Sequence, residues 1–467
     1  RMEKGKFAVE GIQMSLSIPE LPKLRSAAGQ HLVFSKIALG DLVAKDGRID
    51  FQIESPQSFL IEKTHFIWCD GNVDTQSMRI APGVEDYRIT FYCDRLKLAK
   101  VLELLDQFDD PRAQNKVKHP LSTILFISIC AIFCGAEGWE DMVLWAQIHR
   151  KWLSNYVDIS KGIPSYSTIR RVFMLISPHC WGQLIQQSII YAHPNKVAED
   201  HVPIDGKTLR GSKCSSKDIR AIQLVSAWSV ENRIILGEVK TTSKSNEITA
   251  IPLLLELLDL EQSTVSIDAI GCNKTIIDRL LEKGAHYVIG LKKNQPTLYN
   301  GVEMYAKEKG ICAENLILDE FDETHGRCVR RRYFAFDMPE TIANTGFSSI
   351  KTIIAAETIS SSRYDNKGVS SEWRFYVSDH DKSNVKLPQY IRGHWQIESV
   401  HWCLDVHLND DCDKKYEENA AENFAKTKRF LLSLVKVKPP KGKKRSVRSN
   451  LKRVGWDLDY LIELLFG

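Results

Sequence analysis

The amino-acid sequence predicts a multi-domain α/β protein in which helices cover both faces of a mixed β-sheet. Three observations lead to this fold class. At 467 residues, the chain is too long for one ordinary hydrophobic core. Strand-like and helix-like segments alternate between residues 199 and 437, as they do in mixed sheets with covering helices. Helical periodicity dominates residues 99–198, whereas short aromatic and β-branched runs dominate residues 1–98.

Residues 1–98 are predicted to form a small β-rich N-terminal extension. Its candidate strands are separated by Gly, Pro, Asn and Asp, which are typical turn residues. These strands are residues 51–53, 59–62, 65–69 and 87–93. No group of residues in this extension has the spacing of a catalytic or metal site, so we assign it no role.

Residues 99–198 are predicted to form a helical domain. Its most apolar segment, residues 121–136, is shorter than the ~20 residues that a membrane-spanning helix requires. We therefore expect a buried helix and no membrane segment. Ser167 is a candidate cap for a further helix that carries Arg170 and Arg171. These arginines indicate either a helix-turn-helix-like DNA contact or an ordinary exposed basic face.

Residues 199–437 are predicted to form the mixed sheet. A buried strand at 202–204 ends in Asp205, and a second strand at 264–267 ends in Asp268. Between them we expect a hairpin and a helix that is capped by Asn246. A β-rich insertion at about 305–390 interrupts the domain, and a basic tail with a closing helix occupies residues 438–467.

A third acidic residue, Glu398, lies on a predicted helix. Glu398, His401 and Asp405 fall at positions i, i+3 and i+7, so they share one helix face. A solvated helix face is the simplest interpretation of one such carboxylate. Two aspartates at strand ends and one helical glutamate, however, are the arrangement that holds two divalent metal ions in an RNase H-like sheet. Mg²⁺ or Mn²⁺ bound to Asp205, Asp268 and Glu398 could catalyse phosphoryl transfer on nucleic acid.

Composition excludes other classes of site. The eleven cysteines are scattered, and no Cys-x-x-Cys pair occurs, which argues against both a disulfide framework and a zinc site. The net charge of +4 is too small to indicate nucleic-acid binding without a local concentration of charge. The scattered cysteines favour a reducing cytoplasm. A DNA-bound protein would there be associated with the nucleoid.

From about residue 100 to its end, the chain resembles the DDE transposases of bacterial insertion sequences, and in particular the H-repeat-associated proteins. The resemblance rests on several sequence blocks that occur in the same order. They are residues 109–121, 135–141, 204–212, 244–252, 268–272, 292–295, 325–327 and 394–405. It implies an RNase H-like fold and Mg²⁺-dependent cleavage and joining of DNA strands. Terminal inverted repeats and target DNA would be the partners, and Asp205, Asp268 and Glu398 would be the acidic triad.

The chain also departs from related transposases. Those with a Tyr-Arg-Glu-Lys signature have Arg four residues before the glutamate and Lys seven residues after it. Here these positions are His394 and Asp405. Ser399 stands where the H-repeat branch usually has Asn, and Val329 stands where an acidic residue is usual. Residues 1–98 lie outside the resemblance, which is compatible with a fusion or a domesticated element.

Several basic residues are candidates for DNA contacts, each with an alternative role as an ordinary charged surface residue. They are Lys207, Arg210, Lys292, Lys293, His325, Arg327, Arg331, Lys443, Lys444 and Arg445. Trp395 and Trp402 could stack on a displaced base, but tryptophans beside an apolar stripe are more often part of a core.

The sequence therefore predicts a transposase that cleaves the ends of its element and transfers them, with a homodimer in the DNA complex. A domesticated, catalytically inactive DNA-binding regulator is the main alternative. A nuclease without strand transfer is the third hypothesis.

Overall fold

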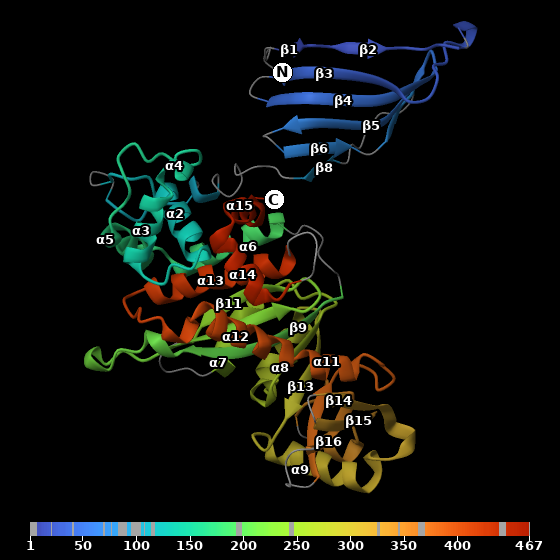
Figure 1. Cartoon of the computed structure of the whole chain (residues 1–467). Helices are drawn as coiled ribbons and strands as arrows, with labels where there is room; N and C mark the ends of the chain where they lie inside the picture. The colour runs from blue at the N-terminus through green and yellow to red at the C-terminus, as the bar shows by residue number, and fades with distance from the viewer. Residues whose placement is uncertain are drawn as a thin grey trace.

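The computed structural model describes most of the chain (Figure 1). The described residues are 7–19, 21–39, 42–68, 71–75, 77–82, 91–94, 104–106, 108–113, 117–192, 199–241, 247–324, 327–343, 346–362, 369–438 and 445–466. They form two β-sheets and many helices, so the chain is a mixed α/β protein.

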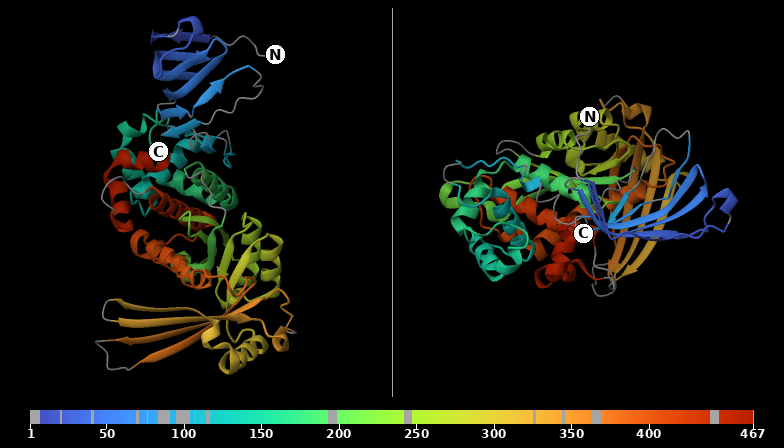
Figure 2. Two further views of the ribbon diagram at one scale, coloured as in Figure 1. Left: turned by 90° about the vertical axis from the view of Figure 1, so that its right-hand side faces the viewer. Right: turned by 90° about the horizontal axis from the view of Figure 1, so that it is seen from above.

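The first sheet is built from the N-terminal residues and lies at one end of the molecule (Figures 1 and 2). Its strand order is β1-β3-β4-β5-β6-β8, with β2 paired to β3 and β7 paired to β5. The strands are β1 Phe7–Glu10, β2 Gln13–Ser15, β3 Gln30–Leu39, β4 Leu42–Ser55, β5 Ser58–Trp68, β6 Gly71–Thr75, β7 Met78–Ile80 and β8 Phe91–Asp94. The two strands predicted at 59–62 and 65–69 are parts of one strand, β5, because Lys63 and Thr64 continue its pairing with β4.

A helical core follows, and it joins segments that are far apart in the sequence. Its N-terminal helices are α2 Leu121–Phe133, α3 Trp139–Ile148, α4 Arg150–Leu153, α5 Tyr166–Leu175 and α6 Pro178–Ala192. Three C-terminal helices complete it, namely α13 Ala420–Val437, α14 Val447–Trp456 and α15 Leu458–Phe466. One hydrophobic cluster contains residues from both groups, including Phe126, Phe424 and Leu461. The predicted closing helix therefore belongs to this core.

Two local expectations about the helical region have different outcomes. Twelve of the thirteen residues of α2 are buried, so the prediction of an apolar buried helix is confirmed. The cap predicted at Ser167 is wrong. The hydroxyl of Ser165 accepts a hydrogen bond from the Thr168 amide at 3.4 Å, and α5 begins at Tyr166. Among the described residues, no helix is long and apolar enough to cross a membrane.

The second sheet has nine strands in the order β11-β10-β9-β12-β13-β17-β16-β15-β14. Its central strands β9, β12 and β13 are parallel, and the neighbours on both sides are antiparallel. The strands are β9 His201–Leu209, β10 Ile222–Ser229, β11 Ile234–Lys240, β12 Thr264–Ile267, β13 His286–Leu291, β14 Leu316–Thr324, β15 Arg327–Asp337, β16 Thr352–Ser362 and β17 Ser370–Ser378. The segment predicted as an insertion extends this sheet, because β17 pairs with β13.

Helices cover both faces of the central strands. On one face, α7 Glu247–Glu256, α8 Lys274–Glu282 and α9 Pro296–Tyr305 pack against the alternate apolar residues of the strands, such as Ile204 and Ile267. On the other face, α11 Leu387–Gly393 packs near Val288, and α12 Trp395–Leu408 packs on Trp228. Because strand side chains alternate between faces, Asp205 must point toward the α12 side.

Candidate active site

Asp205 lies within β9, directly after the last residue of β9 that pairs with β12. The parallel ladder between β9 and β12 ends at the pair Ile204–Ile267. Beyond that pair, β9 continues to Leu209 beside β10 alone, with Asp205 opposite Ser226. The strand was predicted to end at Asp205, and it is longer because β10 continues to pair with it. Asp205 therefore borders a gap where β12 has ended.

Asp268 directly follows β12 and borders the same gap. Its carboxylate accepts a hydrogen bond from the Ile270 amide at 2.9 Å, which caps the short 3₁₀ turn Ala269–Gly271. Two side chains from the loop after β13 hold this turn. The Asn294 amide donates to the Ala269 carbonyl at 2.6 Å, and the Gln295 amide donates to the Cys272 carbonyl at 2.8 Å. The backbone at Asp268 is thus fixed on both sides.

Glu398 reaches the site from α12, and the predicted helix is confirmed. Its apolar stripe, which includes Ile397, Val400 and Leu404, packs on Trp228 and fixes the orientation of the helix. His401 lies one turn further on, and its Nδ1 is 3.5 Å from Oδ2 of Asp205. The His401 ring thus links the helix that carries Glu398 to the strand that carries Asp205.

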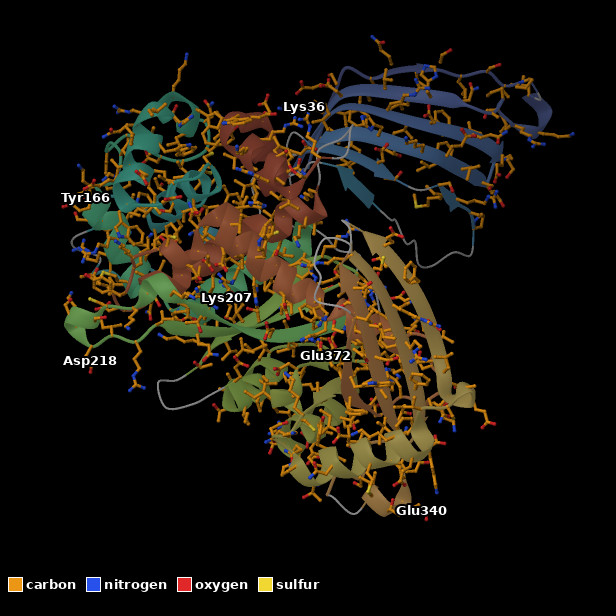
Figure 3. All side chains as sticks on the ribbon, turned by 60° about the horizontal axis from the view of Figure 1, so that its bottom comes forward. Lys36, Tyr166, Lys207, Asp218, Glu340 and Glu372 are labelled. Carbon is orange, nitrogen blue, oxygen red and sulfur yellow. The ribbon has the colours of Figure 1, made fainter. Side chains whose placement is uncertain are left out.

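One cleft brings the three acidic residues together. Asp205, Asp268 and Glu398 all line a hollow of about 400 Å³. Its other polar lining residues include Ser266, Lys292, Glu372, Arg374, Tyr376 and His394. Glu372, which is labelled in Figure 3, is the point at which β17 begins to line this cleft. The cleft thus combines residues that are separated by almost 200 positions in the sequence.

The carboxylates of this region repel one another. Burial raises the pKa of Glu398, and the negative charge of Asp205 raises it further, against the opposing effects of His401 and Arg374. A fourth acid, Glu247 at the start of α7, has its pKa raised by burial and then by Asp205 and Asp268. Such an excess of negative charge favours binding of a cation, which removes the repulsion.

The donor atoms have the chemistry that a hard divalent cation prefers. Mg²⁺ binds carboxylate oxygens and keeps several waters, so it does not need a complete protein cage. Across the described part of the chain, no three His, Cys, Asp or Glu side chains are close enough together to form a metal site. The three acids therefore match the metal in donor type and share one cleft, but their carboxylates do not form a ligand cluster in the described part of the chain.

Three hydrogen-bonded side chains, His201, Ser266 and His394, lie beneath the cleft. Nδ1 of His394 is 3.0 Å from the Ser266 hydroxyl, and Nε2 of His201 is 2.8 Å from the same oxygen. Burial lowers the pKa of both imidazoles, to about 3 for His201, so both rings are neutral at physiological pH. His394 occupies the position where related transposases have Arg. It fixes the helix start to β12 without adding positive charge.

The two basic residues after Asp205 have different environments. Lys207 is buried on β9 beneath the C-terminal helices (Figure 3). Its ammonium is 2.5 Å from Oδ1 of Asp405 on α12 and 3.4 Å from Oδ1 of Asp411. This arrangement indicates that Lys207 positions α12, and it gives no support to a phosphate contact. The Arg210 side chain is 82% exposed, and its Nε lies 3.4 Å from Oδ2 of Asp411.

The other predicted DNA contacts are distributed along the sheet and the tail. Lys292 lines the cleft, and Lys293 beside it is exposed. Arg327 is exposed at the start of β15, whereas Arg331 is half-buried and lies 3.7 Å from Glu320. Arg445 is exposed ahead of α14. His325, Lys443 and Lys444 lie outside the described residues.

The two tryptophans of α12 differ from the prediction. Trp395 and Trp402 are 51% and 56% exposed, so the interpretation of these tryptophans as core residues is wrong. The apolar stripe occupies the adjoining helix face, and the two indoles project on the side of Glu398. Lys436, in the last turn of α13, lies 4.5 Å from the ring of Trp228, and burial lowers its pKa. The basic tail thus begins directly after a packed helix.

Sequence reasoning did not identify Arg374 and Glu247. Arg374 projects from β17, where it donates to Glu372 at 2.9 Å and lies 5.8 Å from the ring of Trp395. Glu247 lies at the start of α7 and accepts a hydrogen bond from the Gln223 amide at 2.5 Å. Arg374 had no distinctive local signal, because charged residues are common on outer strands. Glu247 had one, since it lies inside a sequence block of the resemblance.

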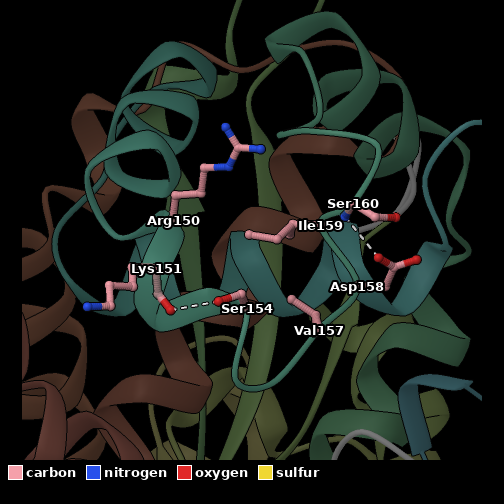
Figure 4. A pocket seen from close by; sticks show the side chains of 7 residues that line it. All are labelled: Arg150, Lys151, Ser154, Val157, Asp158, Ile159 and Ser160. Carbon is pink, nitrogen blue, oxygen red and sulfur yellow. Dashed lines mark hydrogen bonds between the residues drawn. The ribbon is translucent and has the colours of Figure 1, made fainter.

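A second hollow lies in the helical region, away from the acids. Arg150, Lys151, Ser154 and residues 157–160 line it (Figure 4). The Ser160 amide donates to Asp158 at 2.9 Å, and the Ser154 hydroxyl donates to the Lys151 carbonyl at 2.8 Å. These bonds satisfy local turns, and no acidic cluster accompanies them. The hollow is therefore separate from the candidate active site.

Comparison with known proteins adds independent information. Residues 197–432 match the family described as "Transposase DDE domain", and residues 102–187 match the family described as "DDE_Tnp_1-associated". The chain is 34% identical over 379 residues to "Putative transposase YncI" of Escherichia coli O157:H7, which covers 79% of this chain and 95% of that protein. It is 33% identical over 379 residues to "H repeat-associated putative transposase YhhI" of Escherichia coli (strain K12), with 80% and 99% covered.

A solved structure shares only a low likeness with the chain. It is the "Cryo-EM structure of piggyBac transposase synaptic complex with hairpin DNA". The TM-score is 0.39 at 10% identity, over 78% of this chain and 80% of that chain. A likeness at this level supports no argument about the site, so the sequence relatives and the geometry must carry the interpretation.

Proposed function

Because the chain belongs to the bacterial DDE transposases of the H repeat-associated family, we propose that it cuts DNA at the ends of an insertion element and joins these ends to target DNA. One observation carries the proposal. Asp205, Asp268 and Glu398, which lie on three different elements, line one cleft. An inactive DNA-binding protein would not need to retain all three acids in one cleft, so this geometry favours the catalytic hypothesis.

We propose that the nine-stranded sheet is of the RNase H-like type. The strands β11, β10 and β9 form an antiparallel meander, and parallel strands β12 and β13 follow on the other side of β9. Helix α7 forms the crossover between β11 and β12. This topology supports the assignment, because it places the first two acids on neighbouring strands.

Asp205, Asp268 and Glu398 are the residues that would hold Mg²⁺ or Mn²⁺. Bound there, such ions would supply Lewis-acid chemistry for an in-line displacement at phosphorus. His401 would keep the Asp205 carboxylate oriented toward α12, since the two side chains are 3.5 Å apart. Lys292 and Arg374 line the same cleft and would attract the phosphate backbone.

The direct test is a strand-transfer assay with the DNA that flanks the element, with and without Mg²⁺. We expect cleavage at the element ends and joining to a target plasmid only when Mg²⁺ is present. Double-stranded terminal repeats and target DNA are the proposed partners, and a homodimer is the proposed state on DNA. Cleavage without joining would indicate a nuclease, and binding without cleavage would indicate a regulatory protein.

The basic tail should contribute affinity without sequence specificity. Replacing Lys443, Lys444 and Arg445 with glutamine removes charges that contact the DNA backbone. Each lost phosphate contact should flatten the dependence of log K on log salt by about one unit. Salt titrations on terminal-repeat and scrambled duplexes measure this slope. An unchanged slope on both duplexes would contradict a role of the tail in DNA binding.

Arg327 should act on cleavage more than on binding. It is exposed at the first position of β15, where the strand fixes its place, and a fixed charge can set the register of a duplex. We expect Arg327→Gln to lower cleavage of the element's own ends by about tenfold, the equivalent of ~1.4 kcal/mol. Its affinity for scrambled DNA should change less than twofold. Arg279→Gln, at an exposed position of α8, is the matched control.

A further inference from the structure

The parallel pairing of β9 with β12 ends just before Asp205, so β10 is the only strand paired with β9 at this position. On the α12 side, Asp205 lines the cleft with the other two acids. On the opposite side, the start of α7 contacts β9 at Gly206. Gly206, the residue after Asp205, points toward this opposite side, since strand residues alternate between faces. A side chain on α7 can therefore approach the site from this side.

Glu247 occupies this position. A Cβ atom built at Gly206 would lie 2.1 Å from Oε1 of Glu247, so the carboxylate fills the space that the glycine leaves free. The Gln223 side chain holds the same oxygen with a hydrogen bond at 2.5 Å. No ion pair to Glu247 is present among the described residues. The negative charge is thus held against the backbone of the residue next to Asp205, and no cationic side chain of the described residues balances it.

From this geometry we propose that Glu247 is a fourth acidic residue of the active site, which binds the divalent cation from the α7 side of the sheet. The inference rests on the proposed function. It assigns two roles that the acidic triad does not include. Glu247 supplies a carboxylate oxygen to the cation or to one of its bound waters. Gly206 provides the access, because any larger side chain at this position would displace that carboxylate.

Glu247→Gln tests the ligand role. Glutamine keeps the shape and can still accept the hydrogen bond from Gln223, but it loses the charge that binds the metal. We expect its affinity for Mn²⁺ to fall by at least about tenfold, measured by calorimetric titration of the full chain without DNA. The Mg²⁺ concentration for half-maximal cleavage should rise by a similar factor. Glu256→Gln, an exposed site at the other end of α7, is the matched control.

Gly206→Ala tests the access role. The added methyl group meets the flexible end of the Glu247 side chain, so Glu247 should move while the strand keeps its pairing. We expect weakened Mn²⁺ binding with an unfolding temperature close to that of the parent protein. In the double variant with Glu247→Gln, Gly206→Ala should cause little further loss, because both changes remove the same ligand.

Asp268→Asn, measured beside these variants, separates the two levels of the proposal. If Glu247→Gln binds Mn²⁺ as tightly as the parent while Asp268→Asn does not, the role of Glu247 is wrong and the triad stands. If neither the parent nor any variant binds Mn²⁺ or cuts DNA, the proposed function itself fails. Loss of Mn²⁺ binding in Glu247→Gln but not in Glu256→Gln supports the inference.

Discussion

Asp268→Asn is expected to reduce strand cleavage by at least about a thousandfold, or ~4 kcal/mol of activation free energy. Asparagine keeps the shape of the side chain, and its oxygen can still accept the hydrogen bond from the Ile270 amide. The local turn should therefore survive. What is lost is one negative charge on a metal ligand, and the cation that lowers the barrier is then bound weakly.

DNA binding by this variant should persist or become tighter. Removing a carboxylate from the cleft reduces repulsion of the phosphate backbone. Cleavage of labelled terminal-repeat duplexes and gel-shift affinity, measured on the same preparation, separate the two effects. Asp278→Asn on the exposed face of α8 is the matched control and should cut like the parent. An Asp268→Asn protein with the parent's cleavage rate would contradict the triad.

The second large effect concerns stability. Arg429 on α13 is 2% exposed, and it forms ion pairs with Glu238 of β11 and with Asp410, where the distance is 3.2 Å. Arg429→Met would leave both carboxylates buried without a cation. Removal of one partner from a buried ion pair costs roughly 3–5 kcal/mol, so the free energy of unfolding should fall by about this amount. Urea unfolding followed by circular dichroism measures the change.

A more exposed ion pair, between α5 and the segment before α13, provides a matched control. Arg170 donates to Glu417 at 2.6 Å, but the Arg170 side chain is 40% exposed. Solvent screening limits such a pair to about 1 kcal/mol or less, so Arg170→Met should be nearly neutral. Restoring stability to Arg429→Met by Glu238→Gln and Asp410→Asn would identify uncompensated charge as the cause. An Arg429→Met protein as stable as Arg170→Met would rule out this explanation.

The local elements of the site could be predicted from the sequence, because each has a local pattern. Short apolar runs before Asp205 and Asp268 indicated strands, and the apolar stripe beside Glu398 indicated a helix. Their meeting in one cleft was suggested by the family resemblance. It could not follow from spacing, since about 130 residues separate Asp268 from Glu398.

The remaining features depend on contacts between distant segments. Lys207 was predicted to face DNA, but its burial depends on Asp405, almost 200 residues later. The outer strands β14–β17 were predicted to be a separate insertion. Their connection to the sheet is the pairing of β17 with β13, and the sequence of neither strand indicates its partner. Trp395 and Trp402 were ambiguous, since their seven-residue spacing suits both a core stripe and an exposed one.

The shared helical core has a consequence for synthesis of the protein on the ribosome. Helix α2 leaves the ribosome early, yet Phe430, whose ring packs against Phe133 of this helix, is made about 300 residues later. At translation rates of roughly 5–20 residues per second, this apolar helix waits for tens of seconds. Nascent or prematurely terminated chains should therefore depend on chaperones and be degraded. Only a fully translated chain would become a stable enzyme, which limits how much transposase each messenger RNA yields.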